Sequence, residues 1–99
     1  MECQLLDDDE PLVAHPAGRM EASDGAALIA RVQAALTDAA KPVVVDCTQL
    51  EFLNFGGIRA LLRLGRLLAG QGGRLSFANA RGQVAEALML SGLSAIFLD

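Results

Sequence analysis

Residues 43–45 constrain the fold of this chain more than any other feature. They are three consecutive valines, preceded by Pro42 and followed by Asp46. A β-branched run that is apolar on both faces is typical of a strand in the middle of a sheet covered by helices. The run therefore predicts an α/β fold with a largely parallel sheet.

Four further short apolar runs have the length of strands. The first two flank the acidic block 7–10, which predicts a turn, so we expect them to form a hairpin. Consecutive carboxylates in that block lack the alternating oxygen ligands and the glycine of a calcium loop, which argues against a metal site there. With the valine run, the predicted strands are 4–6, 12–15, 43–45, 74–78 and 95–98.

Three helices are predicted between these strands. The first has apolar residues at helical spacing and a cap at Ser23 or Asp24, the second opens at Asn54 and stops at the glycine-rich segment 70–73, and the third stops at Gly92. Their predicted ranges are 24–39, 54–69 and 84–90. The resulting order is ββαβαβαβ, with a mostly parallel five-stranded sheet whose first strand is antiparallel.

Composition limits the classes of function. The length of 99 residues and the hydrophobic fraction of 53% predict one folded domain, residues 1–99. No apolar run reaches the roughly 18 residues of a membrane span, and the first residues do not resemble a secretory signal, so we expect a cytoplasmic protein without direct membrane insertion. Four Phe, no Tyr and no Trp, together with a net charge of −4, argue against a nucleic acid partner.

The sequence contains no recognisable catalytic constellation. His15 is the single histidine, so a paired-histidine metal site cannot form. Cys47 follows the valine run with no cation near it in sequence to lower its pKa, so it is predicted to be a packed, inert thiol. Phosphate-loop and dinucleotide motifs are absent. We therefore predict no enzyme, no metal and no cofactor.

The helix predicted at 54–69 has an unusual surface. Its expected core face comprises Ile58, Leu61, Leu62, Gly65, Leu68 and Ala69. Beside that face runs a stripe of three arginines, Arg59, Arg63 and Arg66, and the far side holds Ala60, Leu64 and Leu67. Either neighbouring helices cover the two leucines, or they form an apolar strip with an arginine rim that binds a protein.

The run 43–62 has a recognisable pattern: a buried strand ending in Asp, a loop, and then Asn54, Phe55, Gly56, Gly57 and Ile58 at the start of a helix. This pattern resembles the central stretch of the STAS family, in which an Asp-Ser-x-Gly-Leu turn caps a helix. Asn54 stands at the Asp, Phe55 at the Ser, and Gly57 with Ile58 at the Gly-Leu.

Three other segments strengthen the resemblance. Residues 18–21, 71–75 and 88–93 are similar to the Gly-x-Leu-Asp, Gly-Gly-x-Leu and Leu-x-x-x-Gly-Leu segments of the STAS family. Together the four segments cover about residues 10–98. The resemblance implies a STAS-like fold and a non-catalytic protein-binding module.

The resemblance also implies two partner classes. Short STAS chains resemble anti-sigma-factor antagonists, which capture an anti-sigma factor kinase, or the STAS subunit that docks on the ATPase of a phospholipid-transport ABC complex. The first class is our leading prediction and the second is the alternative, which the end of the chain soon after its last predicted strand favours. A homodimer is left open. The residues expected to contact a partner are Asn54, Phe55, Gly56, Gly57, Arg59, Arg63, Leu64 and Leu67.

Phe55 distinguishes this chain from the family pattern. The family's serine is a phosphorylated switch, whereas Phe55 has no hydroxyl and cannot accept phosphate. An aromatic ring at this place is either a contact residue for a partner or part of the core beneath the loop. On the first alternative the chain is a partner-switching regulator without its own phosphate control.

Overall fold

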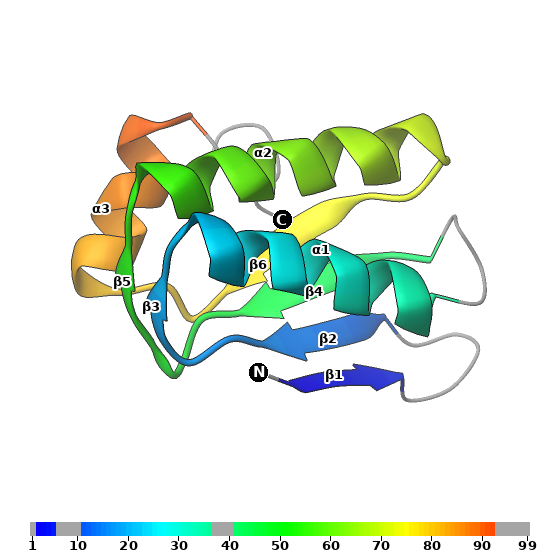
Figure 1. The fold of residues 1–99 in the computed structure, drawn as a ribbon, viewed down its shortest axis with the longest axis horizontal. Helices are drawn as coiled ribbons and strands as arrows, with labels where there is room; N and C mark the ends of the chain where they lie inside the picture. The colour runs from blue at the N-terminus through cyan, green and yellow to red at the C-terminus, as the bar shows by residue number, and fades with distance from the viewer. Residues whose placement is uncertain (1, 6–10, 37–40, 93–99) are drawn as a thin grey trace.

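The computed structural model describes residues 2–5, 11–36 and 41–92. In chain order the elements are β1 Glu2–Leu5, β2 Leu12–His15, β3 Gly18–Met20, α1 Ala22–Ala35, β4 Val43–Asp46, β5 Leu50–Leu53, α2 Phe55–Gly70, β6 Leu75–Ala78 and α3 Gly82–Leu90. Figure 1 shows α1 and α2 side by side over the main sheet, with β3, β5 and α3 gathered at one end. The predicted strand at 95–98 lies outside the described residues.

The main sheet has four described strands in the order β1-β2-β4-β6. β1 is antiparallel to β2, and the other pairs are parallel, so the predicted antiparallel first strand is confirmed. β4 lies inside the sheet, where Val43 pairs with Leu12 on one side and with Leu75 on the other. Val43 and Val45 are fully buried, whereas Val44 on the opposite face is only half-buried. The central strand is thus as predicted, with one face more completely covered than the other.

A second, two-stranded sheet was not predicted. β3 and β5 pair in parallel, with Gly18 opposite Leu50 and Met20 opposite Leu53. The sequence interpretation assigned both segments to connections between the predicted elements. Met20, Leu50 and Leu53 are buried, so the pair extends the core beneath the start of α2. The strand count therefore differs from the prediction, while the α/β fold class is confirmed.

The helix boundaries follow local capping. α1 begins at Ala22, two residues before the prediction, because Glu21 is its N-cap and the Glu21 N–H donates to Asp24 Oδ2 at 3.0 Å. α2 and α3 match their predicted positions within two residues. Residues 37–40 of the predicted first helix lie outside the described residues.

Small residues bring α1 and α2 close together. A Cβ added to Gly25 of α1 would overlap the Cβ of Ala60 on α2. A Cβ added to Gly56 would lie 2.8 Å from the backbone nitrogen of Ala22. The two helices therefore approach each other almost backbone to backbone at the N-terminal half of α2, which fixes the position of the α2 N-terminus.

Candidate functional site

The N-terminus of α2 is held by a side-chain cap and by a buried glycine. Asn54 Oδ1 accepts a hydrogen bond from the Gly57 N–H at 2.9 Å, so the predicted start of this helix at Asn54 is confirmed and its cap is uncharged. Gly57 is buried, and a Cβ there would lie 2.5 Å from the Met20 carbonyl oxygen. Gly57 therefore cannot contact a partner as predicted. Its role is to let α2 pack tightly on β3.

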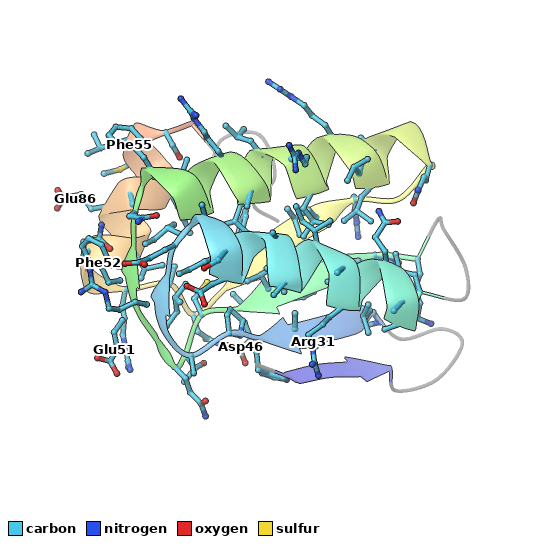
Figure 2. The ribbon with its side chains drawn as sticks, in the orientation of Figure 1. Arg31, Asp46, Glu51, Phe52, Phe55 and Glu86 are labelled. Carbon is cyan, nitrogen blue, oxygen red and sulfur yellow. The ribbon has the colours of Figure 1, made fainter. Side chains whose placement is uncertain are left out.

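Phe55, the first residue of α2, projects into solvent. Its side chain is 84% exposed, and Figure 2 shows it pointing away from the body of the domain. The alternative in which the ring folds back into the core is therefore wrong. The N-cap geometry explains this orientation, because the backbone turns into the helix at Asn54 and the core-facing position of this turn is taken by Gly57.

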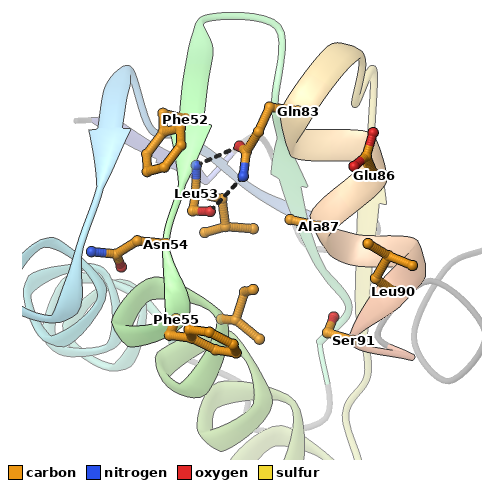
Figure 3. A pocket seen from close by; sticks show the side chains of 10 residues that line it. Phe52, Leu53, Asn54, Phe55, Gln83, Glu86, Ala87, Leu90 and Ser91 are labelled. Carbon is orange, nitrogen blue, oxygen red and sulfur yellow. Dashed lines mark hydrogen bonds between the residues drawn. The ribbon is translucent and has the colours of Figure 1, made fainter.

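A groove of about 460 Å³ opens beside Phe55, between the end of β5, the first turns of α2 and the face of α3 that is turned towards them (Figure 3). Its floor and walls are mostly apolar, with Glu86 as the one acidic side chain among the residues that line it. The residues that line it are Phe52, Leu53, Asn54, Phe55, Ile58, Gln83, Glu86, Ala87, Leu90 and Ser91. A concave apolar surface with a few polar groups is suited to binding.

Gln83 fixes one wall of this groove. Its Oε1 accepts from the Leu53 N–H at 2.9 Å, and its Nε2 donates to the Leu53 carbonyl oxygen at 2.9 Å. Figure 3 shows the two bonds bridging α3 and β5. Because one amide satisfies both backbone groups of Leu53, α3 is held at a defined distance from β5 and from the start of α2.

The contribution of α3 was not predicted. Leu90 is 76% exposed on the groove, although the sequence interpretation gave its helix no part in a binding surface. Val84, Ala87 and Leu88 form the buried face, so Met89 and Leu90 fall off it. The sequence signal that could have indicated this surface was the pair of large apolar residues, Met89 and Leu90, outside the core face of the helix.

On α2 itself, the predicted exposed strip is only partly correct. Arg59 and Arg63 are exposed, and Leu67 is 38% exposed, but Leu64 is fully buried and cannot be a contact residue. The buried residues of α2 are Gly57, Leu61, Leu64, Gly65 and Leu68. The core face is therefore rotated from the predicted one, because Ile58 lines the groove beside α3 while Leu64 packs inward.

A polar cluster closes the carboxyl end of β4, away from the groove. Asp46 Oδ1 accepts from the Thr48 hydroxyl at 2.6 Å, the Thr48 N–H at 3.0 Å and Asn79 Nδ2 at 3.1 Å. His15 Nδ1 lies 3.4 Å from Asp46 Oδ2. The Thr48 and Asn79 hydrogen bonds, opposed by partial burial, lower the pKa of Asp46 to about 2. This carboxylate is thus ionised at neutral pH and organises the turn.

Replacing Asp46 with asparagine is expected to make unfolding less pH-dependent in acid. Because the folded pKa lies below the ordinary 3.8, the carboxylate stabilises the fold above pH 4, and this stabilisation is lost as the pH falls towards 2. The lowered pKa corresponds to up to about 2 kcal/mol. Urea unfolding of the wild type and of Asp46→Asn between neutral pH and pH 2 measures this contribution to the free energy of unfolding. An equal difference between them at every pH would contradict the assignment.

Cys47 is expected to resist alkylation in the native protein. It is 1% exposed, and burial, with a smaller effect of the neighbouring Asp46 charge, raises its pKa to about 11. In a Cys3→Ser variant, iodoacetamide should label Cys47 only after denaturant is added, as mass spectrometry would show. Rapid labelling without denaturant would contradict the buried, inert thiol.

Comparison with known proteins identifies the family. The family model described as "Mlab, STAS domain" matches residues 3–98. The chain therefore belongs to the STAS domain family, and the predicted resemblance is confirmed. STAS domains are in general non-catalytic protein-interaction modules. No curated protein matches the chain significantly in sequence.

Solved structures share the fold at low identity. The unphosphorylated anti-sigma factor antagonist SpoIIAA superposes with a TM-score of 0.67 at 17% identity, over 90% of this chain and 81% of that one. The SulP transporter STAS domain of Vibrio cholerae gives 0.66 at 14%, over 94% and 71%. The murine Slc26a9 anion transporter gives 0.75 at 16% over 93% of this chain, which spans only 15% of that transporter. These likenesses concern the fold alone.

Within the described ranges, no helix combines the length and apolar character that crossing a bilayer requires.

Proposed function

We propose that this chain is a non-catalytic docking module that binds a protein partner through the groove between α2 and α3. Phe55 is the central contact of this site. The observation that carries the proposal is its 84% exposure at the rim of an apolar groove, opposite the 76% exposed Leu90. Two large apolar side chains exposed on either side of one groove are typical of an interface.

Docking at this site does not depend on a phosphate at the family's serine position. Phe55 occupies the position of the family's phosphorylated serine, and Asn54 caps α2 without charge. No phosphate can therefore be installed at Phe55 to repel a partner. Control of the complex would come from the amount of each protein or from changes in the partner.

The ATPase of a phospholipid-transport ABC complex is our first candidate for the partner, in the cytoplasm. A constitutive docking surface suits a subunit that stays bound, because such a subunit needs no release mechanism. The match to the Mlab STAS domain family over residues 3–98 supports a module of this kind.

The kinase-type anti-sigma factor is the second candidate. It is supported by the superposition on the antagonist SpoIIAA, which covers most of both chains. On this candidate, the chain would be an antagonist that lacks the usual phosphoacceptor at Phe55.

Binding measurements with Phe55→Ala test the proposal. Titration calorimetry against each purified candidate partner from the source organism should show a loss of at least about 30-fold, because central aromatic contacts contribute about 2 kcal/mol or more. Met89→Ala is the matched control, since Met89 is 64% exposed on α3 but does not line the groove. Unchanged affinity of Phe55→Ala for a partner that binds, or no binding of either partner, would refute the proposal.

A further inference from the structure

The outer surface of α2 carries an uncompensated positive charge. Arg59, Arg63 and Arg66 are exposed, and α2 contains no acidic residue. Among the residues that the structure describes, none of these three guanidinium groups has a carboxylate within ion-pair distance. The helix therefore presents three cations, which we call the arginine stripe, on a chain whose net charge is −4.

The positions of these arginines do not serve the stability of α2. A helix is stabilised by cations in its last turn, where the partial charge of the helix dipole is negative. The last turn of α2 has no basic residue, whereas Arg59 and Arg63 lie in its first nine residues, Phe55–Arg63. Neither the helix dipole nor an intrahelical ion pair accounts for the stripe.

Two hollows lie along the arginine stripe. One, of about 430 Å³, is lined by Arg59, Leu62, Arg63, Arg66 and Leu67. The other, of about 220 Å³, lies between α1 and α2, and Arg59 and Arg63 also line it. Its remaining lining residues are small or apolar: Ala22, Ala26, Ile29, Gly56 and Ala60. The surface thus alternates apolar depressions with guanidinium groups.

We propose that the arginine stripe binds an acidic amphipathic helix of the protein partner, laid along α2. This inference rests on the proposed docking function and specifies the chemistry of the partner. The stripe has the i, i+4, i+7 spacing of one helix face, with rises of about 6 and 4.5 Å between successive arginines. Carboxylates at matching positions of a second helix can face all three guanidinium groups, while its apolar residues enter the hollows.

The same helix face leads directly to the groove. Phe55, Arg59, Leu62 and Arg66 follow one another at i, i+4, i+7 and i+11, so the aromatic contact and the stripe form one continuous surface. An acidic helix on the stripe would therefore end at Phe55, which anchors it. Charge aligns the partner, and the groove supplies the apolar contact.

A membrane surface fits these observations less well than an acidic helix. Phe55 is the one large apolar side chain that projects far from this surface, since Leu62 is half-buried and Leu67 is 38% exposed, so the stripe itself offers little to insert into a bilayer. An extended anionic surface would also be repelled by the acidic residues elsewhere on this chain, whose net charge is −4. A single helix meets mainly the stripe, because charges farther than about 8 Å are screened at physiological salt.

Peptide binding tests the inference. The probe is a lactam-stapled helix of about 18 residues with glutamates at i, i+4 and i+7 beside leucines, compared with the same helix carrying lysines. By NMR titration, the acidic helix should shift the amide signals of residues 59–67, and its affinity should fall at least about 10-fold in Arg63→Glu/Arg66→Glu. That variant should instead gain affinity for the lysine helix.

A matched control variant separates the effect of position from the effect of net charge. Arg31→Glu/Arg74→Glu makes the same change in net charge at two exposed arginines outside the stripe and should bind the acidic helix like the wild type. Equal binding of the acidic and lysine helices, or no binding of the acidic helix, would overturn the inference. Preferential binding to phosphatidylcholine vesicles containing about 30% phosphatidylglycerol, abolished by Arg63→Glu/Arg66→Glu, would overturn it in favour of a lipid surface.

Failure of the inference can be told apart from failure of the proposed function. If Phe55→Ala weakens the binding of a candidate partner while Arg63→Glu/Arg66→Glu leaves its affinity unchanged, docking at the groove is supported and the assignment of an acidic helix to the stripe is wrong. If neither candidate partner binds but binding of the acidic helix requires the arginine stripe, the proposed partners are wrong and the inference about the stripe is supported.

Discussion

Replacing Leu64 with alanine is expected to lower the free energy of unfolding by about 2–5 kcal/mol, the range for a leucine truncated in a packed core. Leu64 is fully buried beside Leu61 and Leu68, so the lost methyl groups leave a cavity. Urea unfolding followed by circular dichroism measures the change. Partner binding at low denaturant should be nearly unaffected, because the side chain does not reach the surface.

Leu67 provides the matched control on the same helix. Leu67→Ala removes the same atoms at a 38% exposed position and should cost less than about 1 kcal/mol. Similar losses for the two variants would mean that α2 is not rotated as described, and that Leu64 and Leu67 form the common surface strip predicted from the sequence.

Replacing Gly57 with alanine is expected to destabilise the protein by about 1–3 kcal/mol and to weaken partner binding as well. The added methyl group would lie 2.5 Å from the Met20 carbonyl oxygen and 2.7 Å from Leu53 Cδ1. A backbone oxygen cannot move aside without shifting β3, so the start of α2 must move instead. Phe55 would then leave its position at the groove.

Gly70→Ala is the control for the gain in helix propensity. Gly70 is the last residue of α2, and a Cβ there would meet nothing within 4 Å, so stability should be unchanged or slightly raised. Thermal and urea unfolding of both variants give the comparison. A Gly57→Ala protein as stable as Gly70→Ala would show that β3 and α2 are not packed as closely as described.

The α/β fold could be predicted because its strongest signals are local. A run of valines needs a buried strand, and the glycines at 70–73 end a helix whatever lies nearby. The pair β3–β5 could not be predicted. Neither segment is a continuous apolar run, since Arg19 interrupts one and Glu51 the other, and only their mutual pairing, over 30 residues apart, makes them strands.

The candidate site was predictable only in part. The helix start at Asn54 was predictable and is confirmed, because its cap depends only on residues close in sequence. The lack of a phosphate acceptor at Phe55 follows from its side chain alone. The exposure of Leu64 was predicted wrongly, since a helical wheel does not show which side a neighbouring helix covers. The wall formed by α3 depends on the bond between Gln83 and Leu53, which are 30 residues apart in sequence.

That amide bridge also limits how a partner can attach. β5 has only one partner strand, β3, among the described elements, so its outer edge would otherwise offer backbone groups to an incoming strand. At Leu53 both groups are already engaged by Gln83, which acts as a one-residue substitute for a neighbouring strand. Strand addition at Leu53 is blocked, so along this wall of the groove recognition depends on side chains, whose identity can encode the choice of partner.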